Sequence, residues 1–333
     1  MNLVTFQQKG QDPSQQTIGI CKDDSVVSLK EGFKWIQDQG LAPSHISSEV
    51  TENMVRFIEH SESGLPAARR LEASWADLPK NLTYPLSEVQ LLSPIPRPTS
   101  LRDGYAFRQH VETARRNRGV PMIPEFDEFP VFYFSNHLAV SGPGELKVQT
   151  RAMERLDFEL EVGIVIGKEC RNVKADKADE YIFGYMVMND WSARALQMQE
   201  MKLNLGPAKG KDFSTTLGPY LVPREDLAQF SSRDEKGERL DLSMKAWVND
   251  KQLSEGNLKD MTWTFAQIIE RASYGVTLHP GEVIGSGTVG TGCLLELNGS
   301  KITDNLWIKN GDTVALEVDG LGRLENTIKE ENI

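Results

Sequence analysis

A segment near the middle of the chain has the composition of a β-strand and carries acidic residues at alternate positions. Side chains of a strand point to its two faces in turn, so Asp157, Glu159 and Glu161 are expected on one face, about 7 Å apart. Their charges repel one another unless solvent or a cation screens them. The alternation alone is also typical of an exposed sheet face, so both interpretations stay open on this evidence.

Two further features favour a cation. The same strand continues into GIVIG, which has the composition of a segment buried on both faces, and the next apolar run ends on another acid, Asp190. A hard divalent cation is the usual partner of carboxylates that meet in a protein interior. Ligands that are all oxygens indicate Mg²⁺, Mn²⁺ or Ca²⁺ in preference to zinc.

Polar residues suited to binding follow. Asp190 fits a strand end or a helix N-cap, and Arg194 and Gln197 come one and two helical turns later. Lys211 lies in a polar loop beside Gly210, where a glycine permits close approach of a ligand and the lysine can hold an anionic group. Taken alone, such a loop is more often part of the surface.

His110 is a candidate general base, because histidine exchanges a proton near neutral pH. It lies seven residues after Asp103, a possible metal ligand, and is followed by Glu112. A structural role is the alternative, and a lone histidine is more often structural.

A glycine-rich stretch at 285–290 literally matches GxGxxG. A dinucleotide site also requires a helix after the glycines, whereas the following CLLELNGS is predicted to be a short strand, so a nicotinamide-dependent dehydrogenase is disfavoured. We interpret the stretch as a tight loop that brings Glu296 and backbone N–H groups towards a ligand. The absence of GxSxG and GxxxxGK[ST] motifs disfavours serine esterases and P-loop enzymes.

Residues 1–97 are predicted to form a small mixed domain. Short apolar or β-branched runs predict strands near the start, and three segments with helical spacing of apolar residues follow. Pro94, Pro96 and Pro98 enforce an extended chain and cannot continue a helix, so they mark the domain boundary.

Residues 98–333 are predicted to form the catalytic domain, in which strand-like runs dominate. Convincing helical patterns interrupt them at 105–119 and 262–275. Because helices do not alternate with strands as βαβ units require, the pattern favours a mixed, β-rich α+β fold with a largely antiparallel, rolled sheet over a doubly wound one.

The composition excludes several partners. The 333 residues include 37 basic and 48 acidic side chains, a net charge of −11, which is unsuited to general binding of nucleic acid or an anionic membrane. The three cysteines, Cys21, Cys170 and Cys293, are far apart, which fits a reducing compartment. The start of the chain does not resemble a signal sequence and no apolar run approaches membrane-spanning length, so we expect a cytoplasmic protein.

Five segments together resemble the fumarylacetoacetate hydrolase family over roughly residues 98–325. In chain order they are DGYAFRQH, LDFELEVGIVIG, FGYMVMNDWSAR, GKDFSTTLGPYLVP and TLHPGEVIGSGTVGTGCLLEL. The resemblance implies a mixed β-sandwich roll with a small SH3-like N-terminal domain. It also implies a homodimer with one divalent metal, Mg²⁺ or else Ca²⁺ or Mn²⁺, in each active site.

The resemblance also implies roles for individual residues. The implied metal ligands are Asp103, Glu159, Glu161 and Asp190. Asp157 is implied to be a neighbour of the site, and His110 the base that activates water, oriented by Glu296. The residues implied to contact the substrate or the developing charge are Tyr105, Arg194, Gln197, Lys211 and Thr288, with Arg118 and Tyr133 as approximate counterparts in a looser stretch.

The activity implied first is hydrolysis of a carbon–carbon bond in a β-diketo acid, fumarylacetoacetate being cleaved to fumarate and acetoacetate in tyrosine breakdown. Other activities of the family are acylpyruvate hydrolysis, oxaloacetate decarboxylation, and isomerisation or decarboxylation of catechol-pathway dienes. A non-catalytic metal-binding protein is a more distant alternative.

Overall fold

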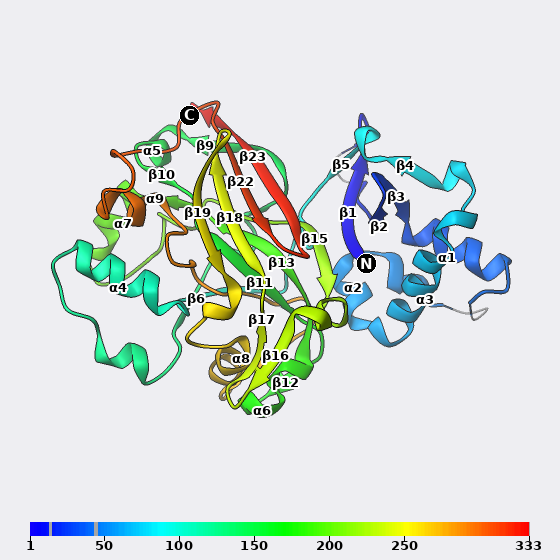
Figure 1. Cartoon of the computed structure of the whole chain (residues 1–333). Coiled ribbons are helices and arrows are strands. Elements are labelled where there is room, and N and C mark those ends of the chain that lie inside the picture. Colours follow the sequence, from blue (N-terminus) through cyan, green and yellow to red (C-terminus); the bar gives the residue numbers. More distant parts are fainter. Residues whose placement is uncertain (13–14, 43–45, 333) are drawn as a thin grey trace.

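The structure is a computed structural model and describes residues 1–12, 15–42 and 46–332. Its N-terminal part lies to one side of the rest, coloured blue to cyan in Figure 1. The strands of this part are β1 (Asn2–Gln8), β2 (Thr17–Lys22), β3 (Ser25–Ser28), β4 (Thr83–Pro85) and β5 (Val89–Leu91). Its α-helices are α1 (Leu29–Asp38), α2 (Met54–Glu59) and α3 (Ser61–Ala73).

Helices α1 and α2 begin at polar residues that cap them. The Ser28 side chain accepts a hydrogen bond from the N–H of Glu31, and Asn53 Oδ1 accepts one from the N–H of Arg56 at 3.0 Å. Strands β1, β2 and β3 and the three helices correspond to the ones predicted from the sequence of this part, whereas β4 and β5 were not predicted.

The remainder of the chain is mainly strands. They are β6 (Leu101–Gly104), β7 (Phe132–Phe134), β8 (Val140–Ser141), β9 (Gly144–Gln149), β10 (Leu156–Asp157), β11 (Leu160–Ile166), β12 (Cys170–Arg171), β13 (Ile182–Asp190), β14 (Ser192–Ala193), β15 (Thr215–Pro223), β16 (Ser231–Asp234), β17 (Gly237–Leu240), β18 (Ser243–Val248), β19 (Lys251–Asn257), β20 (Thr277–Leu278), β21 (Val283–Gly285), β22 (Thr313–Val318) and β23 (Gly322–Glu331). The α-helices are α4 (Arg108–Asn117), α5 (Thr150–Met153), α6 (Ala175–Ala178), α7 (Arg194–Met201), α8 (Phe265–Ser273) and α9 (Leu294–Gly299).

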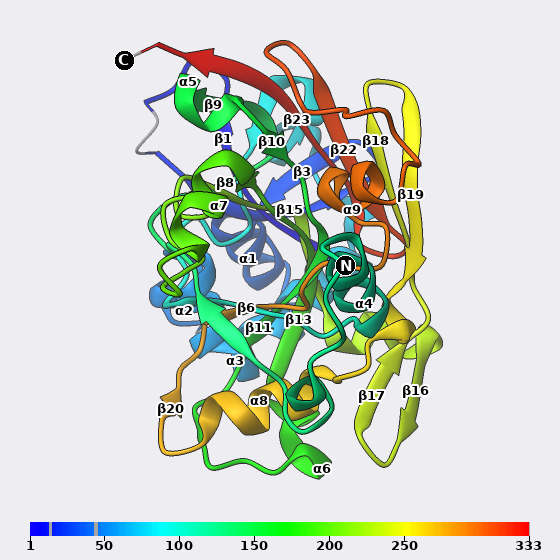
Figure 2. The same cartoon turned by 90° about the vertical axis from the view of Figure 1, so that its left-hand side faces the viewer.

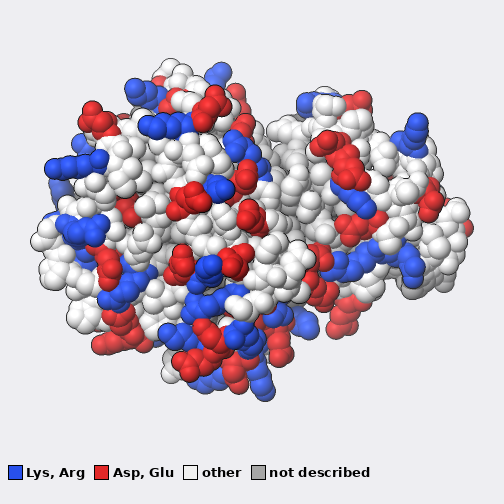
Figure 3. Space-filling model, viewed as in Figure 1, with Lys and Arg blue, Asp and Glu red and all other residues white. Residues whose placement is uncertain are grey.

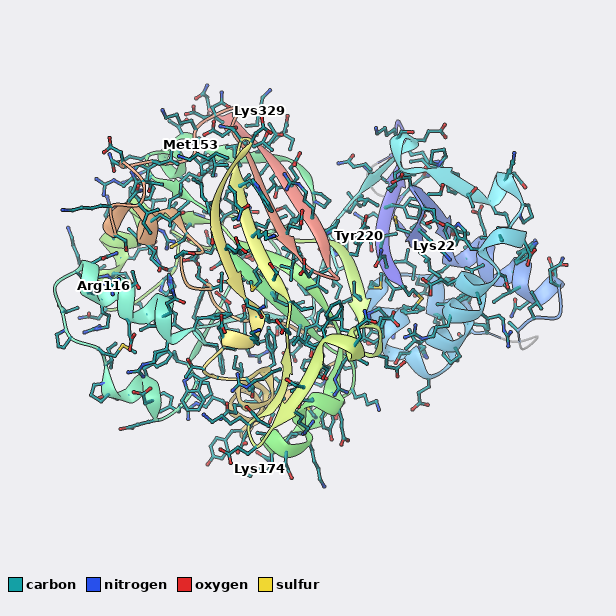
Figure 4. All side chains as sticks on the ribbon, in the orientation of Figure 1. Lys22, Arg116, Met153, Lys174, Tyr220 and Lys329 are labelled. Carbon is teal, nitrogen blue, oxygen red and sulfur yellow. The ribbon has the colours of Figure 1, made fainter. Side chains whose placement is uncertain are left out.

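One large sheet runs through the whole molecule in the order β4-β3-β2-β1-β15-β13-β11-β21-β6-β7. Most neighbours are antiparallel, and β21 and β6 form a parallel pair. The N-terminal strands join this sheet where β1 pairs with β15, and Tyr220, labelled in Figure 4, lies on β15 at this junction. The predicted domain boundary between residues 97 and 98 stays a prediction.

The central strands of this sheet are mainly apolar because both faces are covered. Successive residues of β11 face opposite sides: Val162 and Ile164 belong to one core cluster, and Val165 belongs to another. The first cluster also contains residues of a second sheet, ordered β19-β18-β22-β23-β9, and of α8. The second contains residues of α1, α2 and α3.

The molecule therefore has the predicted mixed α+β class, with large sheets packed in layers and no closed barrel among the described elements. In Figure 2 the second sheet extends from β9 at the upper left of the molecule to β19 at its right. Acidic and basic side chains are interspersed over the face shown in Figure 3, and no large acidic patch is seen on that face. Among the described residues, no helix has the length and apolar character needed to cross a bilayer.

Two predictions of local structure are wrong. The CLLELN run forms helix α9 and not a strand, because backbone N–H groups at its start are bound by a distant carboxylate, that of Asp157. The single strand predicted to carry Asp157, Glu159 and Glu161 is interrupted. Strand β10 ends at Asp157 and β11 begins at Leu160, with Phe158 and Glu159 between them. The side chain of Asn189 on the neighbouring strand accepts the N–H of Glu159 at 2.9 Å and fixes this break.

Candidate active site

Four carboxylates meet where adjacent strands of the large sheet end. Asp103 lies in β6, Glu161 near the start of β11 and Asp190 at the end of β13, while Glu159 lies in the break before β11. Strands β13, β11, β21 and β6 are neighbours in that order, so residues far apart in sequence converge. The sheet thus assembles the whole predicted ligand set in one place.

The geometry of this cluster fits a divalent cation. Each residue offers a carboxylate oxygen, and the four oxygens lie within 4.8 Å of one another. All four side chains are buried, and Glu161 Oε2 and Asp190 Oδ1 have no hydrogen-bond partner among the described residues. Buried polar atoms without partners are unfavourable, and a cation bound by oxygen ligands would satisfy both.

The electrostatics of the cluster point the same way. Burial raises the pKa of Asp103 to about 8, and the neighbouring charge of Asp190 adds to the rise. Burial, followed by the charge of Asp103, raises the pKa of Glu161 well above its ordinary value. Burial likewise raises the pKa of Asp190. Carboxylates so placed are hard to ionise together without a nearby cation.

Lys211 supplies part of that positive charge. Its ammonium donates to the carboxylates of Glu159 and Asp190 and to the Asp190 carbonyl oxygen at 3.2 Å. Burial would lower the pKa of Lys211, but the charges of Asp190 and Glu159 outweigh it and raise the pKa. Burial would raise the pKa of Glu159, but Lys211 and Arg194 hold it below its ordinary value. The lysine therefore remains an ammonium beside an ionised carboxylate.

His110 and Glu296 form a buried hydrogen-bonded dyad next to these carboxylates. His110 Nδ1 lies 2.7 Å from Glu296 Oε2, and Glu296 Oε1 accepts the N–H of Thr291 at 2.9 Å. Helices α4 and α9, which carry the two residues, are in contact and lie side by side in Figures 1 and 2. A carboxylate on Nδ1 fixes the imidazole with its other nitrogen, Nε2, as the proton acceptor. Glu112 instead accepts from Arg108 Nε at 2.7 Å and does not orient the histidine.

Arg194 holds acidic residues of the site together. Its guanidinium donates to Asp157 Oδ2, to Glu159 Oε1 (both at 2.8 Å) and to Gln197 Oε1 at 2.9 Å. Asp157 is fully buried and belongs to none of the groups that could hold a metal in the described chain, in agreement with its implied place beside the ligands.

The other residues implied to contact substrate lie around the same cluster, with one at its margin. The Tyr133 hydroxyl donates to Asp190 Oδ2, and Thr288 Oγ1 lies 3.3 Å from Glu161 Oε1. The ring of Tyr105 packs edge-on against that of His110, with centroids 5.8 Å apart. Arg118 is exposed at the end of α4; burial raises the pKa of Tyr105, and Arg118 opposes that rise.

The glycine-rich loop serves the carboxylates and not a phosphate. The N–H of Gly287 donates to Asp103 Oδ1 at 3.2 Å. A Cβ atom on Gly285 would lie 2.3 Å from that same oxygen, so only glycine leaves room for it. Neither this contact nor the role of Asn189 was predicted from the sequence, although Asn189 directly precedes a predicted ligand.

Comparison with known proteins gives a consistent set of relatives. The family model described as the C-terminal domain of fumarylacetoacetate (FAA) hydrolase matches residues 99–329. Oxaloacetate tautomerase YisK of Bacillus subtilis is 28% identical over 319 residues, covering 93% of this chain and 94% of that protein. Fumarylacetoacetase of Oryza sativa subsp. japonica is 30% identical over 295 residues, covering 72% of this chain and 68% of that protein.

Solved structures share the fold at low sequence identity. Maleylpyruvate hydrolase from Sphingobium sp. SYK-6, in complex with manganese(II) and pyruvate, has a TM-score of 0.67 and 22% identity, covering 99% of both chains. Fumarylacetoacetate hydrolase from Exiguobacterium antarcticum has a TM-score of 0.68 and 22% identity, covering 99% of this chain and 100% of that one.

Proposed function

The chain belongs to the fumarylacetoacetate hydrolase family, and we propose that it is a metal-dependent hydrolase that cleaves a carbon–carbon bond in a β-diketo acid. Fumarylacetoacetate is the substrate we propose first. The observation that carries the proposal is the buried hydrogen bond between His110 and Glu296 beside four converging carboxylates. A hydrolase needs a base to activate water, and this dyad provides one.

Asp103, Glu159, Glu161 and Asp190 would hold the metal, which we propose to be Mg²⁺ or Mn²⁺. The unpartnered oxygens of Glu161 and Asp190 support this donor set. When bound, the ion polarises a dicarbonyl group and neutralises the enolate that forms on cleavage.

In the proposed reaction His110 takes a proton from water through Nε2, and Glu296 stabilises the resulting imidazolium through Nδ1–H. The hydroxide adds to the ketone carbon next to the carbon–carbon double bond, and the bond that later breaks joins this carbon to the CH₂ group between the two ketones. Lys211, held as an ammonium, and the NH₂ group of Gln197, whose oxygen is bound by Arg194, are the donors proposed for the oxyanion.

Collapse of this intermediate breaks the carbon–carbon bond and leaves its electron pair on the departing enolate. His110 returns its proton to that enolate, and the products are two carboxylic acids, fumarate and acetoacetate. We propose Tyr105, Tyr133, Thr288 and the exposed Arg118 as the residues that orient the substrate.

Tautomerisation or decarboxylation of oxaloacetate is the second candidate. The favouring observation is the relative that covers nearly the whole of both chains and is named an oxaloacetate tautomerase. Neither reaction requires attack by water, although each passes through an enolate that a metal ion would stabilise.

A small substrate panel separates the candidates. Fumarylacetoacetate, acetylpyruvate and oxaloacetate are assayed with Mg²⁺ or Mn²⁺, using the wild-type chain and His110→Ala. We expect fumarylacetoacetate to be cleaved, and His110→Ala to reduce its turnover by about 10²–10⁴-fold, the usual contribution of a general base. Turnover of oxaloacetate alone, unchanged in His110→Ala, would overturn the hydrolase and support the second candidate.

Assembly is a separate proposal. We propose that the chain forms the homodimer implied by its family, with two active sites. Light scattering during size-exclusion chromatography tests it: a mass near twice 37.3 kDa is expected, and a monomer would contradict it.

A further inference from the structure

Asp157 is a fully buried carboxylate that the proposed reaction does not use directly. Three donors saturate it. Its Oδ1 accepts the N–H of Leu294 at 2.7 Å, and its Oδ2 accepts the N–H of Leu295 at 3.0 Å and Nε of Arg194 at 2.8 Å. The residue before α9, Cys293, makes no side-chain cap, so Asp157 binds the start of this helix from another part of the chain.

Helix α9 determines where Glu296 lies. Glu296 is the residue after Leu295 and contacts His110 Nδ1 at 2.7 Å. Because α9 has only six residues, it has little stability of its own, and its position depends on contacts to the surrounding structure. A shift at its start would therefore change the Glu296–His110 distance.

Arg194 connects Asp157 to the carboxylate cluster. The same guanidinium that binds Asp157 also donates to Glu159 Oε1 at 2.8 Å. The buried Asp157–Arg194 ion pair therefore binds both the start of α9, which carries Glu296, and Glu159 of the carboxylate cluster.

We propose that Asp157 is a positioning residue that joins the general base to the metal centre. Through α9 it holds Glu296 against His110, and through Arg194 it holds Glu159 in place. The inference rests on the proposed function, because that function makes His110 the base.

Asp157→Asn tests this with little change in volume. All three donors point at the two carboxylate oxygens, so either orientation of an amide places its NH₂ group against at least one N–H. We expect the Asp157→Asn substitution to release the start of α9, and the Glu296–His110 hydrogen bond to loosen with it.

The decisive readout is the tautomer of His110 in the Mg²⁺-loaded protein, measured by NMR with ¹⁵N-labelled histidine. The chain has five histidines, and the spectrum of His110→Gln identifies the resonance. We expect one tautomer in the wild type, with Nδ1 protonated, and a mixture in Asp157→Asn. For fumarylacetoacetate we expect kcat to fall roughly 10- to 100-fold, with a smaller change in KM.

Asp179→Asn is the matched control. Asp179 is also a buried carboxylate that accepts one arginine, Arg233, at 3.0 Å and one backbone N–H, that of Glu238, at 2.9 Å. It belongs to neither group of residues that could hold a metal in the described chain, so its variant neutralises a buried, arginine-bound carboxylate and should keep the single His110 tautomer. The same tautomer mixture in both variants would overturn the proposal by showing a general structural effect.

Arg194→Lys keeps a cation but cannot bind Asp157 and Glu159 together. It is the variant for the tautomer measurement if Asp157→Asn does not fold. We expect it to mix the His110 tautomers as well. A single Nδ1-protonated tautomer in either folded variant would contradict the proposal. The NMR measurement of the His110 tautomer needs no turnover. It therefore tests the positioning role of Asp157 even if the chain does not hydrolyse fumarylacetoacetate.

Discussion

Glu238, which is half-buried, and Glu161, which is buried, have opposite surroundings. Glu238 accepts hydrogen bonds from Arg224 Nε and Ser231 Oγ, both at 2.8 Å, and from the Tyr185 hydroxyl at 2.9 Å. Burial would raise its pKa, but these donors, Arg224 first, bring the pKa below its ordinary value. Glu161 is more deeply buried and keeps one oxygen without a partner in the described part of the chain, and its pKa is raised.

The contrast separates structural carboxylates from ligand carboxylates. A buried acid that only supports the fold collects enough donors to stay ionised. Around Glu161, however, three further acids converge and two oxygens remain unpartnered among the described residues. A glutamate is therefore surrounded by donors in one place, and in the other it keeps an oxygen that a cation could bind.

The largest effect is expected for Glu161→Gln. The substitution keeps the shape of the side chain but removes an anionic ligand. Since a catalytic metal contributes several kcal/mol and each 1.36 kcal/mol is a factor of ten, we expect turnover to fall on the order of 10³-fold. Steady-state kinetics at saturating Mn²⁺ measure it, and near wild-type turnover would show that Glu161 is not a ligand.

Metal addition provides the second test. At a Mn²⁺ concentration 100 times its Kd, binding to the folded state should raise the free energy of unfolding by about 2.7 kcal/mol. Calorimetry with and without Mn²⁺ measures this for the wild type and for Glu161→Gln. Equal stabilisation of both proteins would place the ion elsewhere.

Glu238→Gln should reverse the pattern seen for Glu161. Removing an ionised acceptor from Arg224 is expected to lower the free energy of unfolding by about 1–3 kcal/mol, with turnover per folded molecule unchanged. Denaturant unfolding and active-site-normalised kinetics check both parts. A loss of turnover without a loss of stability in Glu238→Gln would show that Glu238 is not a purely structural carboxylate, in contrast to its proposed difference from Glu161.

The smallest effect concerns the room left for Asp103. In Gly285→Ala the new Cβ would lie 2.3 Å from Asp103 Oδ1 and 2.7 Å from Met188 Cε, so the carboxylate must shift. We expect the affinity for Mn²⁺ to fall roughly tenfold, about 1.4 kcal/mol. Gly163→Ala is the control, because Gly163 lies opposite Gly285 on β11 and its nearest contacts, at 3.5 Å or more, are ordinary. Equal losses in both variants would attribute the effect to the strands in general.

The sequence predicted the acidic residues of the site better than their surroundings. Alternation grouped Asp157, Glu159 and Glu161, of which the last two lie in the carboxylate cluster, and the end of an apolar strand located Asp190, since both patterns are local. Helix α9 was mispredicted because it is short and its start is bound by Asp157, more than a hundred residues earlier in the chain. Local composition contains no trace of such a contact.

Long-range pairing also decided the roles of other residues. Tyr133 reaches Asp190 because β7 pairs with β6, and its own segment contains no sign of this. The substrate contact implied for Arg194 stays a prediction, and its nitrogens bind Asp157, Glu159 and Gln197. A sequence motif identified the residue, and only the fold showed which partners its guanidinium has.

The most direct test of the hydrolase is the fate of water oxygen. Fumarylacetoacetate is cleaved by the Mn²⁺-loaded protein in ¹⁸O-labelled water, and the products are analysed by mass spectrometry, with the label in unreacted substrate as the correction for carbonyl exchange. The proposed hydrolase reaction predicts one ¹⁸O in the fumarate carboxylate formed at the cleaved bond, and loss of this product in His110→Ala. No cleavage of fumarylacetoacetate, together with rapid enol–keto conversion of oxaloacetate, would contradict it.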